Sequence, residues 1–138
     1  MAKATKRPMT LVMMASEAER IHMALMMGAT AAAVGRPVTF FFSKSAIGFL
    51  QTDGWTKLAA SGGQTGPEMD SVLMAKGIAD STVLLDGLAA LDARFVACET
   101  ALREHDIDAS TLVTRPAVEI SGLADILEKG AGGDWLTF

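Results

Sequence analysis

Cys98 is the only cysteine in this chain of 138 residues, and the sequence around it favours thiol chemistry. Phe95-Val96-Ala97, directly before it, is typical of a short buried strand, and Glu99 to His105 is typical of a helix. Cys98 is therefore expected where a strand ends and a helix begins. The amino end of a helix carries partial positive charge and free N–H groups, which stabilise a thiolate.

Two neighbours of Cys98 complicate this interpretation. A carboxylate at Glu99 suits the start of a helix, but it competes with a thiolate for the same positive field. The nearest histidine in sequence, His105, lies about two turns along the expected helix, which gives weak support for a Cys–His catalytic pair. A lone cysteine is also commonly a small, inert core residue. The sequence therefore leaves both a reactive and a merely packed Cys98 open.

The composition predicts one globular domain over residues 1–138, with residues 1–8 as a loose N-terminal tail. Half of the residues are hydrophobic and 20% are charged, which argues against disorder. The net charge of −4 argues against a general nucleic-acid binder. A single cysteine suits a reducing compartment, and the apolar stretch 23–34 is too short to span a membrane. We therefore expect a cytoplasmic protein with no membrane span.

Buried strands alternate with helices along the sequence. This alternation predicts an α/β fold, a three-layer sandwich with a mainly parallel five-stranded sheet and helices on both faces. The expected strands are 10–14, 38–42, 95–97, 111–114 and 135–138. The expected helices are 16–34, 46–50, 68–76, 82–91, 99–105 and 119–129, the first of them with Ser16 and Glu19 as a capping box. The segment 51–66 has the least regular pattern, and such a loop is often a lid, a binding surface or an oligomer contact.

The ends of the expected strands define a candidate site, because reactive groups gather at the carboxyl edge of a parallel sheet. A flavodoxin-like strand order of 2-1-3-4-5 would place Cys98 at the crevice where the chain reverses, facing Ser16 and Glu17 after the first strand. Lys44 after the second strand and Arg115 after the fourth are the cations nominated to stabilise a thiolate.

No cofactor and no metal is expected. The glycine-rich stretch 62–66 lacks the Gly-Lys-Ser/Thr ending of a phosphate-binding loop, and the loop after the first strand lacks the hydroxyl groups of a flavin-phosphate site. The methionines around His22 could bind Cu(I), but their positions on the first strand and helix favour core packing.

Four segments of the chain resemble the DsrE/DsrF-like sulfur-relay family, which includes the TusD-like carriers. They are the strand, helix and strand from Thr10 to Phe42; the helix 84–88 with the strand that ends at Cys98; the stretch from Cys98 to Ile107; and 117–127, which resembles the penultimate helix of the family.

The resemblance implies a compact α/β sandwich that assembles into oligomers, often trimers or hexamers. It also implies that the cysteine at position 98 carries sulfur as a persulfide between donor and acceptor proteins. The long segment 51–66 and Glu99 depart from the best-defined carriers. Two alternatives remain on the same fold, a non-catalytic oligomeric interaction module and a small-molecule binder.

Overall fold

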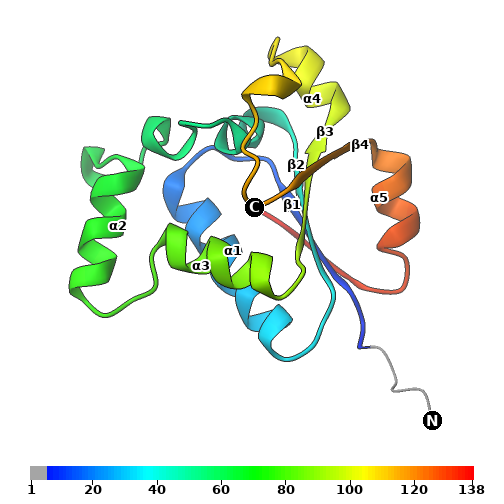
Figure 1. The fold of residues 1–138 in the computed structure, drawn as a ribbon, viewed down its shortest axis with the longest axis horizontal. Coiled ribbons are helices and arrows are strands. Elements are labelled where there is room, and N and C mark those ends of the chain that lie inside the picture. Colours follow the sequence, from blue (N-terminus) through cyan, green and yellow to red (C-terminus); the bar gives the residue numbers. More distant parts are fainter. Residues whose placement is uncertain (1–5) are drawn as a thin grey trace.

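Five parallel strands form a single sheet in the computed structural model, which describes residues 6–138 (Figure 1). The strands are β1 (Met9–Met13), β2 (Val38–Phe42), β3 (Arg94–Cys98), β4 (Val118–Ser121) and β5 (Asp134–Thr137). Their order across the sheet is β4-β3-β2-β1-β5. The first two strands lie where their continuous apolar runs predict them, because strands covered on both faces need no polar alternation.

Helices lie on both faces of the sheet, which confirms the predicted α/β architecture (Figure 1). α1 (Ala18–Ala33) packs against α3 (Ser81–Ala90) on one face, and α5 (Leu123–Lys129) lies on the other. α2 (Gly66–Ala75) stands outside α3, and the short α4 (Glu99–Glu104) projects from the carboxyl edge of the sheet. Four 3-10 turns complete the fold, η1 (Lys44–Leu50), η2 (Trp55–Lys57), η3 (Ser61–Gly63) and η4 (Ala109–Thr111).

A stack of phenylalanine rings fills the layer between the sheet and α1. The rings of Phe40 and Phe95, on neighbouring strands, lie 5.2 Å apart and almost parallel, and Phe42 stacks on Phe49 of η1 at 5.4 Å. Gly28 of α1 sits directly over the Phe40 ring, where a Cβ atom would overlap it. The glycine therefore lets the helix approach the sheet closely. This contact also shows that the side chains of Phe40 and Phe95 lie on the face of the sheet covered by α1 and α3, called here the α1/α3 face.

The strand order differs from the expected 2-1-3-4-5. β2 lies between β1 and β3, and the chain reverses direction between β1 and β5 rather than between the first and third strands. Periodicity in a sequence identifies strands but does not say which of them pair. From β1 to β4, each new strand is added beside the preceding one, always on the same side of it. The chain then returns past β1 to add β5 on its other side, and because parallel crossovers are right-handed, α5 in this return lies on the opposite face of the sheet.

The fourth strand also lies elsewhere than expected. Residues 111–114 do not enter the sheet; instead, the amide N–H of Val113 donates to Leu50 O at 2.8 Å and that of Thr52 to Thr111 O at 3.0 Å. β4 is formed by Val118–Ser121, which were expected partly within a helix, and α5 begins only at Leu123. An edge strand has few buried side chains, so its apolar signal merges with that of the helix that follows.

The start of α1 and the N-terminal segment are held by contacts that the sequence did not reveal. The residue capping α1 is Glu17 rather than Ser16, and the Glu19 carboxylate accepts from the Ser61 N–H at 2.6 Å instead of closing a capping box. The tail expected over residues 1–8 lies in part outside the described residues; in its described part, Arg7 pairs with Asp134 of β5 at 2.7 Å. Within residues 6–138, no helix is both long and apolar enough to cross a membrane.

Candidate functional site

Cys98 is the last residue of β3 and directly precedes the first turn of α4, as the sequence predicts. β3 lies between β2 and β4, so Cys98 sits at the carboxyl edge of the sheet next to its register partner Ser121. The residue is only 4% exposed. The structure thus holds a free thiol at a sheet edge, beneath the surface.

The Cys98 side chain belongs to the face of the sheet that carries α5. Side chains alternate along a strand, so Phe95 and Ala97 share the α1/α3 face while Val96 and Cys98 share the other. The neighbouring strand supports this assignment. Ser121, the register partner of Cys98, has its side chain on the same face, and its hydroxyl donates to Asp125 of α5 at 2.9 Å. That hydrogen bond holds the pKa of the Asp125 carboxyl below its ordinary value, with a further contribution from Lys129.

Glu99 is exposed and leans toward the connection between β4 and α5. Its Oε1 lies 3.1 Å from the position that a Cβ atom would take on Gly122. A side chain at residue 122 would therefore crowd the carboxylate, and the glycine leaves room for it. Glu99 is the described carboxylate nearest to Cys98 in sequence, and it places negative charge beside the edge that holds the thiol.

Ser16 and Glu17 do not flank Cys98. They follow β1, which is separated from β3 by β2, so the predicted crevice between them and Cys98 is absent from this sheet order. Glu17 pairs with Arg20 at 2.8 Å, and Ser16 is half-buried. The expectation failed because it depended on β1 and β3 being neighbours.

Lys44 follows β2, the strand next to Cys98, but its charge is directed elsewhere. Its Nζ donates to Glu104 Oε2 at 3.0 Å, which ties the turn after β2 to the last residue of α4. This hydrogen bond lowers the pKa of the Glu104 carboxyl. The charge of the Lys44 ammonium is therefore paired at the C-terminal end of α4, whereas Cys98 lies at the N-terminal end.

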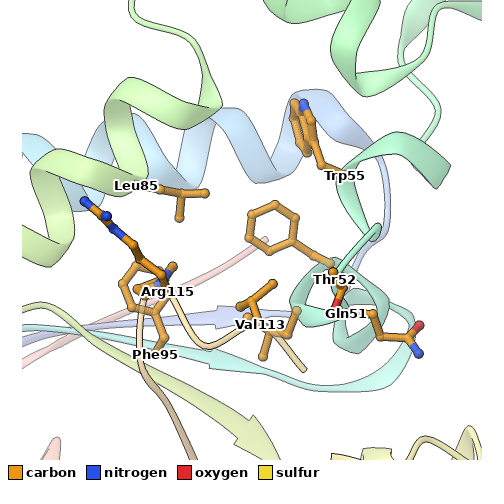
Figure 2. Close-up of a pocket in the computed structure, with 10 residues that line it drawn as sticks. Gln51, Thr52, Trp55, Leu85, Phe95, Val113 and Arg115 are labelled. Carbon is orange, nitrogen blue, oxygen red and sulfur yellow. The ribbon is translucent and has the colours of Figure 1, made fainter. Parts of the chain in front are cut away.

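Arg115 lies three residues before β4 rather than after a strand, and this corrects its predicted place at the carboxyl edge. The start of β4 pairs with Phe95, near the amino end of β3, so Arg115 and Cys98 belong to opposite ends of that strand pair. Arg115 instead lines an apolar pocket of about 140 Å³ on the α1/α3 face of the sheet, the face that carries Phe95 (Figure 2). The displacement follows directly from the misplaced fourth strand.

The pocket beside Arg115 is the feature that sequence reasoning missed. Its walls come from segments far apart in the chain, namely η1, the loop that follows it, η2, α3, β3 and the segment before β4. Its apolar lining residues, such as Phe49, Leu85 and Val113, look like ordinary core residues when each is taken alone. Among the described residues, no cluster of His, Cys, Asp or Glu is arranged to hold a metal ion.

Comparisons with known proteins find similarity in structure alone. No family profile matches the chain, and no curated protein matches it. The protein of unknown function MTH1491 from Methanobacterium thermoautotrophicum superposes with a TM-score of 0.66 and 13% identity, covering 96% of this chain and 100% of that one. The ychN protein from E. coli superposes with a TM-score of 0.62 and 17% identity, with the same coverage.

A third solved structure, the conserved protein of unknown function BT1422 from Bacteroides thetaiotaomicron, has a TM-score of 0.56 and 9% identity. The superposition covers 95% of this chain and 94% of that one. At these identities the likeness establishes the fold, and that fold is consistent with the DsrE-like resemblance of the sequence.

Proposed function

We propose that this protein is a sulfur carrier that holds sulfur as a persulfide on Cys98 and passes it to a partner protein. The observation that carries the proposal is the position of the one thiol, at the carboxyl edge of the sheet and immediately before α4. Reactive groups gather at this edge in parallel α/β folds. The resemblance of the sequence to the DsrE/DsrF-like proteins gives that position its specific chemistry.

The transfer takes place in two exchange steps with no net oxidation. The Cys98 thiolate attacks the outer sulfur of a donor persulfide, the donor S–S bond breaks, and the donor leaves as a thiolate while the Cys98 persulfide forms. An acceptor thiolate then attacks the outer sulfur on Cys98, which releases the Cys98 thiolate and leaves the persulfide on the acceptor. The chain has no second cysteine, so the acceptor is another molecule.

Access to Cys98 is the structural requirement of this mechanism, because the residue is nearly covered in the isolated chain. The elements that adjoin it at this edge are short: α4 has six residues, and the connection from β4 to α5 consists of Gly122 alone. We propose that these short elements open locally and expose the thiol to the donor and the acceptor. Local opening of a short segment costs less than global unfolding.

Intact mass measurement tests the proposal. After incubation with polysulfide and removal of excess reagent, the folded protein should gain the mass of sulfur, and Cys98→Ser should gain none. A subsequent excess of low-molecular-weight thiol should return the original mass. Mass gain in Cys98→Ser, or none in the wild type, would count against sulfur carriage.

Alkylation kinetics separate the carrier from a non-catalytic interaction module in which Cys98 is merely packed. For a carrier, iodoacetamide should modify the folded protein faster than global unfolding permits, since local opening suffices. If the modification rate follows global unfolding across a denaturant series, Cys98 is a core residue and the carrier proposal fails.

We also propose that the protein works in the cytoplasm as a homo-oligomer, a trimer or hexamer as the resemblance implies. Support comes from α5, where Leu123 and Leu127 lie one turn apart and are 62% and 59% exposed. Neighbouring exposed leucines of this kind are typical of surfaces that are covered by a partner.

A further inference from the structure

We propose that the pocket beside Arg115 binds a small carboxylic acid with an apolar body about the size of one aromatic ring. The pocket has a volume of about 140 Å³. An apolar cavity of roughly 150 Å³ accommodates a benzene molecule. The size therefore selects a single ring or a short branched chain, and it excludes a nucleotide or a flavin.

The walls of the pocket suit an apolar ring. Three aromatic side chains, Phe49, Trp55 and Phe95, line it together with Leu85 and Val113. In Figure 2, Trp55 lies at one end, Leu85 and Phe95 lie at the other, and Val113 lies between them. Aromatic rings in contact gain stacking and edge-to-face attraction in addition to the effect of burial.

The Trp55 wall is held in place before any ligand arrives. Its indole N–H donates to Asp70 of α2 at 2.7 Å, and the same carboxylate accepts from the hydroxyl and the backbone N–H of Ser81 at the start of α3. The Trp55 ring also packs edge-on against Phe49, with centroids 5.8 Å apart. A pre-formed wall reduces the ordering cost of binding.

Arg115 provides the charge that specifies an acid. None of the residues that line the pocket is acidic, and Arg115 makes no ion pair within residues 6–138. Figure 2 shows its side chain beside Leu85 at the end of the pocket. A guanidinium binds a carboxylate through two parallel N–H···O bonds, and here it has no ionic partner to give up. A ligand whose ring fills the pocket can thus pair its carboxylate with Arg115 at the rim.

Phenylacetate is the probe, and its neutral isostere phenylacetamide is the matched ligand control. Titration of the ¹⁵N-labelled protein should shift the indole N–H signal of Trp55 and the amide signals around Val113. Arg115→Gln should weaken phenylacetate binding about tenfold and leave phenylacetamide binding unchanged. Arg103→Gln is the matched protein control, because Arg103 is an exposed arginine of α4 outside the pocket and also lacks an ion pair among the described residues.

Two further variants complete the test. Leu85→Phe fills the pocket and should abolish binding of both ligands while the circular dichroism spectrum stays that of the wild type. Cys98→Ser should bind phenylacetate normally, because Cys98 belongs to the opposite face of the sheet; the inference therefore stands or falls independently of sulfur carriage. Equal affinity of wild type and Arg115→Gln for phenylacetate, no binding up to its solubility limit, or shifts confined to other surfaces would overturn the inference.

Discussion

Lys44 reaches Glu104 rather than Cys98: its Nζ lies 3.0 Å from Glu104 Oε2, so the turn after β2 is joined to the last residue of α4. This pair brackets α4 at one end, while Cys98 occupies the other. The cation that follows the strand next to Cys98 therefore contributes to the anchoring of α4.

The first prediction concerns the pKa of Glu104. Lys44 lowers this pKa from its ordinary value of 4.5, so Lys44→Gln should raise it, as measured by NMR titration of the carboxyl carbon. A carboxyl whose pKa is lowered on folding stabilises the folded state above its unfolded pKa, and this stabilisation is lost as the pH falls through the folded value. Wild type and Lys44→Gln should therefore converge in stability in acid. An unchanged Glu104 titration in the variant would contradict the ion pair.

The second prediction concerns Glu99 and the reactivity of Cys98. Glu99→Gln removes a negative charge beside the sheet edge that holds Cys98. Because a nearby negative charge disfavours the thiolate, its removal should increase the rate of sulfur loading about twofold to fivefold. Stopped-flow reaction with polysulfide measures this rate. Asp92→Asn, an exposed position just before β3 at the other edge of the sheet, is the matched control and should not change it. Slower loading in Glu99→Gln would mean that the carboxylate assists transfer.

The third prediction concerns the close approach of α1 to the sheet. Gly28→Ala should reduce the free energy of unfolding by about 1–3 kcal/mol, because the new methyl group would overlap the Phe40 ring. Gly87→Ala in α3 is the matched control: apart from its chain neighbours and the backbone of its own helix, nothing lies within 4 Å of its added Cβ. That variant should gain up to about 1 kcal/mol from helix propensity. Urea titration measures both, and equal effects would contradict the contact.

The fourth prediction concerns Asp70, which joins η2 to the start of α3. Asp70→Ala removes the acceptor of three hydrogen bonds and should cost about 2 kcal/mol of stability. It should also weaken phenylacetate binding, because the Trp55 wall loses its anchor. Asp53→Ala, an exposed aspartate in the preceding turn, should alter neither. Unchanged fluorescence of Trp55 and unchanged binding in Asp70→Ala would show that the wall does not need this anchor.

The fifth prediction concerns α5 as a subunit contact. Leu127→Glu should shift the protein to a smaller species in sedimentation equilibrium, because an isolated charge is poorly tolerated in an apolar interface. Glu128→Gln, an exposed neighbour on α5, should leave the assembly unchanged. A wild type that sediments as a monomer, or a variant with unaltered mass, would contradict the proposed assembly surface.

The sequence predicted the parts of the fold that carry a strong local signal. β2 was predicted with its observed bounds, and β1 to within one residue, because both are short runs dominated by large apolar residues. The junction at Cys98 was also predicted, since an apolar strand there meets a helix without an intervening loop.

Properties that depend on long-range pairing were not predicted. Strand order is decided by which edges meet, and neither β1 nor β3 encodes that it will pair with β2. β4 was missed because Val118–Ser121 is an edge strand with no fully buried residue, followed at once by an apolar helix. Arg115 was misplaced as a consequence, and the pocket it lines exists only once η1, α3 and the segment before β4 come together.

The pairing of β5 with β1 affects how the chain can be made. β1 is the first strand in chain order and β5 is the last, yet the two are hydrogen-bonded neighbours. During translation, one edge of β1 therefore has no partner until the residues of β5 emerge from the ribosome. The nascent sheet carries an open edge throughout that time, and open edges invite pairing with other chains. Completion of the sheet thus waits for β5, the last of the five strands to be synthesised.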